Sequence, residues 1–222
     1  MIKIAFVCKA NEERSPTAEA FANEFIKKNK LYDKIQVSSR GVYVEHIQRI
    51  LKTEDIHDKF VPNLLKVYVI ECALKNGIFN AKQIKKAEYL LTKGNFNQIE
   101  INELYLFAKK EAMRRTREIY LPFLEKKGLK VKYYHPEHLM PDDYDYIIPL
   151  LQDESFEVEK IFYGTGYTPK IVLFHKFIGI KNECPIVVTS GDLKVYESLY
   201  GYMKENVPRL MKKILEVENA PG

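Results

Sequence analysis

Residues 2–16 read IKIAFVCKANEERSP, and this stretch decides the fold. The apolar run of residues 2–7 is typical of a buried strand, and it ends directly at Cys8. A short polar loop then leads to Arg14. Ser15 is a good N-cap residue and Pro16 suits the first helical position, so we expect a helix to begin there. The pattern therefore predicts a strand, a tight loop and a helix in direct succession.

The loop between Cys8 and Arg14 has the chemistry of an anion site with a nucleophile at its floor. A strand-to-helix turn gathers backbone N–H groups, and the helix behind it contributes about half a positive charge. The guanidinium of Arg14 can hold two phosphate oxygens at once. The same field should favour the thiolate of Cys8, which is the reactive form. The alternative interpretation is a structural cysteine beside a surface arginine.

The residues inside this loop are the candidate substrate-binding residues. Asn11 tolerates the left-handed backbone conformation that such a tight turn often needs. For Glu12 and Glu13 we favour a solvated loop face. If the two carboxylates faced the site instead, their charge would weaken phosphate binding and disfavour a thiolate. The full candidate set is Lys9, Ala10, Asn11, Glu12, Glu13 and Ser15.

Length and composition limit the classes of protein that this chain can be. Its 222 residues suffice for one sizeable domain with an insertion or for two small domains. A formal net charge of +5 favours anionic substrates without requiring nucleic acid. Cys8, Cys72 and Cys184 form no disulfide framework or short-spaced zinc cluster. Since we expect no signal peptide and no membrane-spanning stretch, we predict a cytoplasmic protein. We expect no cofactor.

Hydrophobic periodicity divides the chain into an α/β part and a helical part. A helix over 16–29 and a strand over 35–39 complete a βαβ opening, which implies a parallel pair of strands. The pattern is helical from about residue 44 to residue 128, and Pro122 should kink or restart the last helix. Later strands are expected at 146–151 and 185–189, weaker ones at 129–134 and 170–174, and a closing helix at about 192–217.

These patterns predict an α/β domain of residues 1–45 and 125–222 with a helical insertion of residues 46–124. We expect the insertion to cap the site or to mediate formation of a homo-oligomer. A basic run in it could contact nucleic acid, but Glu111 and Glu118 favour a salt-bridged, solvated face. The run consists of Lys109, Lys110, Arg114, Arg115 and Arg117.

Several stretches resemble the low-molecular-weight protein tyrosine phosphatase family, which includes thioredoxin-linked arsenate reductases. The most specific is the loop itself, from Val7-Cys8 through Asn11 to Arg14-Ser15-Pro16, followed by Ala18-Glu19-Ala20. Shorter likenesses follow in the family's chain order at residues 37–41, 127–129, 145–148, 153–155 and 196–200. The central helices have no counterpart in the family's minimal form.

The resemblance implies an α/β fold with a four-stranded, doubly wound parallel sheet and helices on both faces. It also implies hydrolysis of a phosphomonoester in two steps through a cysteinyl-phosphate, without a metal. In that scheme Cys8 attacks phosphorus while Arg14 and the loop amides hold the oxygens. Ser15 would hydrogen-bond the thiolate, and Asn11 would lock the shape of the loop.

One element of the family's chemistry is missing from its expected place. The family carries a general-acid aspartate, usually as Asp-Pro, before its last helix. Here the expected position falls near Val187 or Val188, which cannot donate a proton. Asp192 is the nearest carboxylate. It is either the catalytic acid or the N-cap of the final helix.

The leading hypothesis is therefore hydrolysis of a phosphomonoester, including phosphotyrosine in proteins, by Cys8, Arg14 and Asp192. The alternative is a protein that binds phosphate or a phosphorylated ligand with weak or no catalysis. Arsenate reduction is less expected, because it needs two further cysteines close together, whereas Cys72 and Cys184 are isolated in apolar settings. The expected partner is a phosphorylated protein or small molecule, and a membrane or nucleic acid is not expected.

Overall fold

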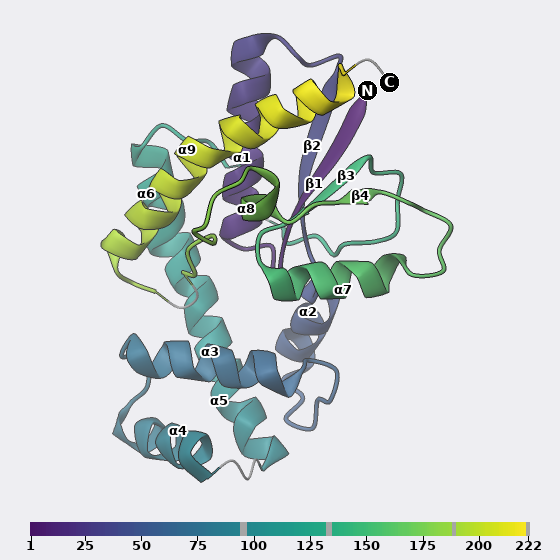
Figure 1. Cartoon of the computed structure of the whole chain (residues 1–222). Helices are drawn as coiled ribbons and strands as arrows, with labels where there is room; N and C mark the ends of the chain where they lie inside the picture. Colours follow the sequence, from purple (N-terminus) through teal and green to yellow (C-terminus); the bar gives the residue numbers. More distant parts are fainter. Residues whose placement is uncertain (94–96, 132–134, 188–189, 221–222) are drawn as a thin grey trace. The chain divides into compact units, whose positions relative to one another are not determined.

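The computed structural model describes residues 1–93, 97–131, 135–187 and 190–220. The chain divides into two compact units, whose course Figure 1 follows from the N-terminus to the C-terminus. The first unit consists of Met1–Val44, Leu124–Ile186 and Glu197–Gly222. The second consists of Glu45–Phe123 and Val187–Tyr196.

The first unit is built on a four-stranded sheet in which every strand is parallel to its neighbours. The strands are β1 (Ile2–Cys8), β2 (Ile35–Gly41), β3 (Tyr146–Pro149) and β4 (Lys170–Ile171), in the order β2-β1-β3-β4 (Figure 1). Ile4 of β1 lies opposite Val37 of β2 on one side and opposite Tyr146 of β3 on the other. The predicted α/β class with a four-stranded parallel sheet is confirmed.

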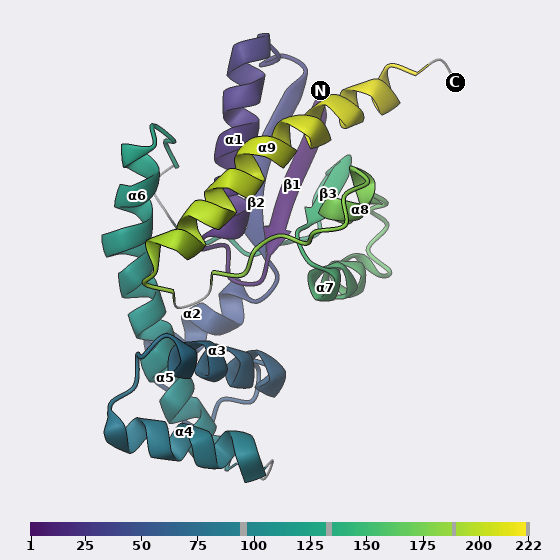
Figure 2. The ribbon, with the colours of Figure 1, turned by 60° about the vertical axis from the view of Figure 1, so that its left-hand side comes forward.

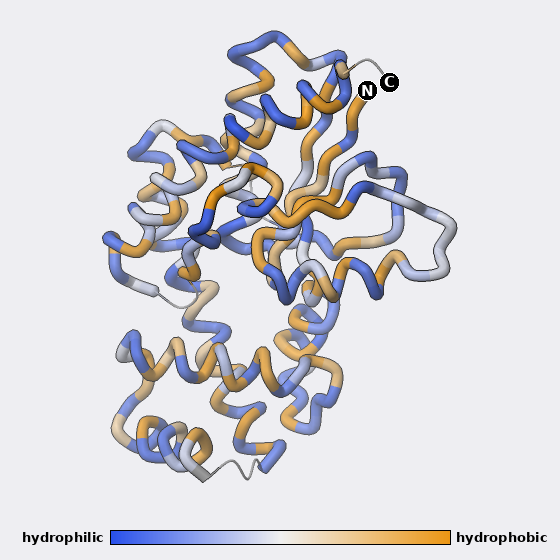
Figure 3. Tube along the Cα trace, in the orientation of Figure 1, coloured by the Kyte–Doolittle hydropathy of each residue, from blue (hydrophilic) through white to orange (hydrophobic). Residues whose placement is uncertain are grey.

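Helices cover both faces of this sheet, which explains why β1 is apolar without alternation (Figure 3). Helix α7 (Gln152–Phe162) packs on one face, where Val158 joins a core cluster with Ala5 and Ile147. Helix α1 (Arg14–Asn29) and the part of α9 (Leu193–Glu218) from Glu197 onward lie on the other face (Figure 2). There Phe21 of α1 meets Tyr200 of α9 edge to face, with ring centroids 5.3 Å apart. The layers leave the C-terminal ends of the strands free to carry loops.

The fourth strand is not the one that the sequence most strongly predicts. Lys170–Ile171 pairs with β3 and is followed by the short helix α8 (Phe174–Phe177), whereas residues 185–187 are irregular although Val187 is buried. An apolar run signals burial but does not distinguish a strand from a buried loop. The prediction of a strand at 185–189 is therefore wrong in its described part, as is the weaker one over residues 129–131. Residues 132–134 and 188–189 lie outside the described residues.

Helix α1 begins at Arg14, earlier than the predicted start at residue 16. Glu13 occupies the N-cap position without a side-chain capping bond. The prediction that Ser15 caps this helix is wrong, because its hydroxyl instead contacts the Cys8 sulfur and the Arg40 carbonyl. Pro16 still fits the first turn, where the backbone N–H groups have no partner within the helix.

The second unit is helical. Its elements are α2 (Val44–Thr53), α3 (Asn63–Lys75), α4 (Ala81–Lys93), α5 (Gln98–Arg115), the π-helical segment η1 (Thr116–Tyr120) and α6 (Leu121–Lys126), of which α2 and α6 each extend into the first unit. The elements α5, η1 and α6 follow one another without a break. Pro122 has no backbone N–H to donate to the preceding turn of the helix. The disruption predicted at Pro122 takes the form of the π-helical segment η1 just before it.

A buried ion pair organises the segment that leads into α3. Lys66 Nζ lies 3.1 Å from Asp58 Oδ2 and donates to the Asp58 carbonyl oxygen at 2.9 Å. Arg49 binds the other carboxylate oxygen of Asp58 at 3.0 Å. Burial lowers the pKa of the Lys66 ammonium. Burial alone would raise the pKa of Asp58, but hydrogen bonds from the Val61 amide and Lys66 bring it below its ordinary value.

The predicted basic run lies on α5 and η1 and is largely salt-bridged. Arg114 pairs with both Glu111 and Glu118, and Arg115 Nε lies 3.2 Å from Glu111. Lys109 is buried, so the run is not one continuous cationic surface. These contacts agree with the salt-bridged face that the sequence favours.

In the described part of the chain, no helix is both long enough and apolar enough to cross a membrane.

Candidate active site

The predicted nucleophile lies where β1 ends and the loop begins. Cys8 is only 3% exposed. Its sulfur is 3.0 Å from the Ser15 hydroxyl oxygen and accepts a hydrogen bond from the Asn11 backbone N–H at 3.2 Å. The loop thus brings two polar groups onto the single atom that the predicted chemistry uses.

Ser15 links this sulfur to the neighbouring strand. Its oxygen accepts a hydrogen bond from the Asn11 side-chain amide at 3.1 Å, and its proton can reach the Arg40 carbonyl at 3.2 Å or the sulfur of Cys8. A Cys8 thiol can donate to Ser15 while Ser15 donates to Arg40. A thiolate instead accepts the Ser15 proton. The hydroxyl can therefore follow the charge on sulfur by rotation alone.

Two backbone features fix the shape of the loop. Asn11 has a φ of 53°, in the left-handed region, as its position in the sequence predicts. Gly41, at the end of β2, lies so close to the loop that an added Cβ would be 2.8 Å from the Asn11 nitrogen and 2.6 Å from Val44 Cγ2. Only glycine allows this approach. The Asn11 side-chain oxygen also accepts the backbone N–H of Glu137 at 2.9 Å, which ties the loop to a distant segment.

The predicted phosphate-binding arginine is held by a carboxylate that lies 140 residues away in sequence. Arg14 Nη2 donates to Glu154 Oε1 at 2.8 Å, and both side chains are buried. The second oxygen of Glu154 accepts the backbone N–H groups of Leu150 and Leu151 at 3.2 and 2.9 Å. Burial raises the pKa of Glu154, and the charge of Arg14 opposes that rise. The carboxylate therefore anchors the guanidinium to the start of α7.

Helix α7 contributes further carboxylates around the loop. Asp153 Oδ2 lies 2.5 Å from Lys9 Nζ. Tyr43, whose backbone N–H donates to the Lys9 carbonyl, has its pKa raised by burial and by nearby Glu157. The first turns of α7 thus bind residues from both the loop and the segment after β2.

The acidic residues of the loop differ from the favoured expectation. Glu12 and Glu13 are each 9% exposed, so the interpretation of a solvated loop face is wrong for both. Part of the reason is the early start of α1, which makes Glu13 the junction between loop and helix. Ala10 is half-buried. A Cβ added to Gly41 would lie 3.0 Å from the carbonyl carbon of Ala10.

Asp192 lies in the second unit, at the N-terminus of α9. Its Oδ1 accepts the backbone N–H of Lys194 at 2.9 Å, which is the contact of an N-cap residue. Val187, one of the two positions expected for the acid, is buried, and Val188 lies outside the described residues. Burial raises the pKa of the Cys184 thiol to about 12. No group of three His, Cys, Asp or Glu residues within the described ranges is placed to hold a metal ion.

Sequence reasoning missed the partners that position the loop. Glu154 was part of a stretch resembling the family, but nothing local to residues 153–155 indicates that it binds Arg14. The available signal was its position just after a buried strand, at the sheet edge where the loop also lies. Arg40, Asp153 and Glu137 likewise reach the loop only through the fold.

The first unit thus combines a parallel α/β sheet with a cysteine at the end of β1 and an arginine and a serine at the start of α1. Residues 3–58 match the family model of the low molecular weight phosphotyrosine protein phosphatases. This segment matches that family by sequence, and the match confirms the resemblance predicted from the loop. No curated protein matches the chain by sequence.

Solved structures extend the likeness in fold to nearly the whole chain. YfkJ from Bacillus subtilis is 17% identical, with a TM-score of 0.55 over 99% of this chain and 98% of that one. A protein tyrosine phosphatase from Entamoeba histolytica is 18% identical, with a TM-score of 0.54 over 98% and 99%. The YwlE arginine phosphatase from Geobacillus stearothermophilus is 14% identical, with a TM-score of 0.53 over 100% and 99%. At these identities the likeness establishes the fold.

Proposed function

We propose that this protein hydrolyses phosphomonoesters through a cysteinyl-phosphate on Cys8. The observation that carries the proposal is the placement of the Cys8 sulfur, 3.0 Å from the Ser15 hydroxyl and 3.2 Å from the Asn11 N–H, at the floor of the loop that leads into α1. A strand end, a left-handed turn and a helix start suit the binding of a phosphate dianion.

In the proposed first step, the Cys8 thiolate attacks phosphorus, an S–P bond forms and the P–O bond to the leaving group breaks. Arg14 stabilises the charge on the non-bridging oxygens, and Glu154 holds its guanidinium in place. In the second step, water attacks the phosphocysteine, releases inorganic phosphate and restores the thiolate. Rotation of the Ser15 hydroxyl would accompany each change of charge on sulfur.

The leaving oxygen also needs a proton, and Asp192 is our candidate donor. One of its oxygens caps α9, so only the other is available to carry that proton. General acid help is typically worth about 10² to 10⁴ in rate, so an ineffective acid would leave a slow enzyme that prefers good leaving groups. Replacing Asp192 with Asn tests this role, because Asn can still cap the helix but cannot donate an acidic proton.

The structural relatives bear the names of both tyrosine and arginine phosphatases. We therefore propose phosphotyrosine as the leading substrate group and include phosphoarginine in the test. p-Nitrophenyl phosphate serves as the general probe, since its leaving group needs little protonation. Turnover that disappears in Cys8→Ser supports the proposal, whereas no turnover from about pH 5 to about pH 8, or turnover unchanged in Cys8→Ser, contradicts it.

A specific observation favours a second candidate, a phosphate-binding protein with little catalysis. Both cations of the loop are already engaged by carboxylates, Arg14 by Glu154 and Lys9 by Asp153. Such pairing reduces the positive charge available to a substrate. This candidate predicts that phosphate or vanadate raises the melting temperature while p-nitrophenyl phosphate is not turned over. The absence of any thermal shift would exclude it.

A further inference from the structure

The helical unit contains a hollow of about 340 Å³ between the end of α2 and the junction of α5 with η1. All of its lining residues belong to the second unit, and none of them has a role in the proposed hydrolysis. They are Leu51, Lys110, Met113, Arg114, Arg117 and Glu118. Pockets of this size are large enough to hold a small organic ligand.

The lining residues combine an apolar part with a row of cations. Leu51 and Met113 are half-buried and supply the apolar part. Lys110, Met113 and Arg117 follow one another at spacings of three and four residues, which places them on one face of the helix. Arg117 belongs to η1, and π-helical turns are frequent at functional sites. The hollow is therefore apolar with a basic rim.

Contacts within the helical unit hold the two walls of the hollow together. Lys110 Nζ of α5 lies 2.6 Å from Oε1 of Glu54, the residue that directly follows α2. The side-chain amide of Asn102, also on α5, donates to the Ile56 carbonyl at 2.6 Å. The segment after α2 is thus bound to α5 at two points, and the hollow is a preformed part of this unit.

Arg117 carries the one positive charge of this rim that no neighbour compensates. Arg114 is bound by Glu111 and by Glu118, so the carboxylate of Glu118 is also neutralised. Lys110 has its own carboxylate partner. Arg117 is exposed, and in the part of the chain that the structure describes its guanidinium has no partner. An anion that enters the hollow would therefore find a free guanidinium beside apolar side chains.

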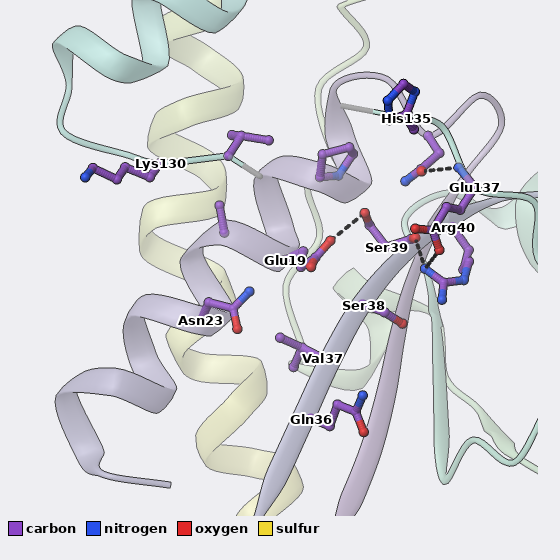
Figure 4. Close-up of a pocket in the computed structure, with 14 residues that line it drawn as sticks. Glu19, Asn23, Gln36, Val37, Ser38, Ser39, Arg40, Lys130, His135 and Glu137 are labelled. Carbon is purple, nitrogen blue, oxygen red and sulfur yellow. Dashed lines mark hydrogen bonds and ion pairs between the residues drawn. The ribbon is translucent and has the colours of Figure 1, made fainter. Parts of the chain in front are cut away.

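A hollow of the first unit, beside β2, has a different electrostatic character (Figure 4). Its Arg40 is held by Glu137 at 2.6 Å. Glu19 adds a carboxylate, one oxygen of which accepts the Ser39 hydroxyl at 2.7 Å (Figure 4). An anion there would be repelled by the charge of Glu19. An organic anion is therefore better suited to the hollow of the helical unit.

We propose that the hollow of the helical unit binds a small aromatic carboxylate. Arg117 holds the carboxylate with its planar fork of donors. The ring packs against Leu51 and Met113, and a methionine sulfur makes favourable contacts with aromatic rings. A single carboxylate matches the single unpaired guanidinium, whereas a nucleic acid requires several free cations. This binding involves no chemistry at Cys8 and does not depend on the proposed hydrolysis.

The methyl resonances of the methionines in the full chain test the proposal directly. The probe is 2-naphthoate, for which we expect a dissociation constant of about 1 mM. Its ring current should shift the Met113 methyl resonance in a saturable way. Met203 and Met211, which are buried in the first unit, should not shift. The absence of a shift of Met113 at about 10 mM probe would overturn the proposal.

Matched controls separate the contributions of the charge and the ring. 2-Naphthamide has the same rings without the charge and should bind about fivefold more weakly than 2-naphthoate. Arg117→Gln should weaken binding of 2-naphthoate about fivefold and leave that of 2-naphthamide unchanged. Lys85→Gln, at an exposed position of α4 outside the hollow, should alter neither. Equal weakening by the two substitutions, or equal affinity for the two probes, would contradict the proposal.

Discussion

A buried ion pair lies in each unit of this protein, Lys66–Asp58 in one and Arg14–Glu154 in the other, and the two pairs differ in what surrounds them. In the helical unit, Lys66 and Asp58 are 0% and 2% exposed, and Asp58 also binds Arg49. In the sheet unit, Arg14 and Glu154 are 6% and 0% exposed and lie beside the loop that holds Cys8. The first pair closes a network within the fold. The second holds a cation beside the loop of the cysteine that we propose as the nucleophile.

The choice of cation explains this difference. An ammonium such as Lys66 directs its few donors at one centre, here the Asp58 side chain and carbonyl. A guanidinium has five donors on a rigid plane, so Arg14 can be held by Glu154 and still present donors to a phosphate. We infer that the Lys66 pair serves stability and that the Arg14 pair serves binding and catalysis.

The largest expected effect comes from Arg14→Lys, which keeps the charge but loses the planar fork. We expect kcat/KM for p-nitrophenyl phosphate to fall by about 10³-fold, because loss of an arginine that stabilises transferring phosphate is typically this costly. The melting temperature should change little, since the lysine can still pair with Glu154. Steady-state kinetics and thermal unfolding on the same sample measure both. A loss of less than tenfold would remove Arg14 from the proposed mechanism.

In the other pair, Lys66→Met should act on stability alone. Removing Lys66 leaves the buried Asp58 carboxylate with Arg49 and the Val61 N–H, and we expect the free energy of unfolding to fall by about 3 kcal/mol in urea denaturation. Activity per folded molecule should be unchanged at a temperature where the variant is folded. If kcat fell in parallel with stability, the separation of roles between the two pairs would be lost.

Glu154→Gln tests the positioning role directly. The amide can still accept backbone hydrogen bonds from the start of α7 but no longer fixes Arg14 by charge. We expect kcat to fall about tenfold, since small misplacements of a catalytic group are costly. Inhibition by phosphate should become tighter, because Arg14 is less neutralised. Asp58→Asn is the matched control, and a similar fall in kcat there would contradict the assignment.

The smallest expected effect is the pH dependence of stability, which should differ in sign between the pairs. The pKa of Asp58 lies below its ordinary 3.8, so its contribution is present above that value and is lost as pH falls through the folded pKa. The pKa of Glu154 lies above its ordinary 4.5, so its contribution is present below that value and is lost as pH rises through the folded pKa.

Urea unfolding from about pH 3 to about pH 7 should reveal the two contributions separately. Asp58→Asn should flatten the acid side of the profile, and Glu154→Gln should flatten the decline above about pH 5. Identical changes of the pH profile in both variants would show that the two carboxylates titrate alike. That result would contradict the opposite directions of their pKa shifts.

The parts of the site that were predictable from sequence lie within one short stretch. Cys8, Asn11, Arg14 and Ser15 are close along the chain, so residue types and spacing predicted their loop. Predictions from local sequence were wrong where a contact with another part of the fold replaced the expected local one. Ser15 has the composition of an N-cap, but its hydroxyl binds the sulfur and the Arg40 carbonyl, and the helix starts before it.

Long-range partners and short strands were not predictable in the same way. Glu154 reaches Arg14 only because β1 and β3 are parallel neighbours whose C-terminal ends meet. Lys66 interrupts an apolar helical stripe. No residue near it in the sequence indicates that Asp58 is buried with it. The fourth strand has only two residues, too few to show an alternating pattern, while the more apolar 185–187 is buried without pairing.

The most direct test of the central claim is the mass of the intact protein after rapid acid quenching from a mixture with p-nitrophenyl phosphate. The account predicts one added phosphoryl group, mapped to Cys8, that forms with the burst of product and is absent from Cys8→Ser. Product formation without that adduct in the unmodified protein, or the same adduct in Cys8→Ser, would contradict it.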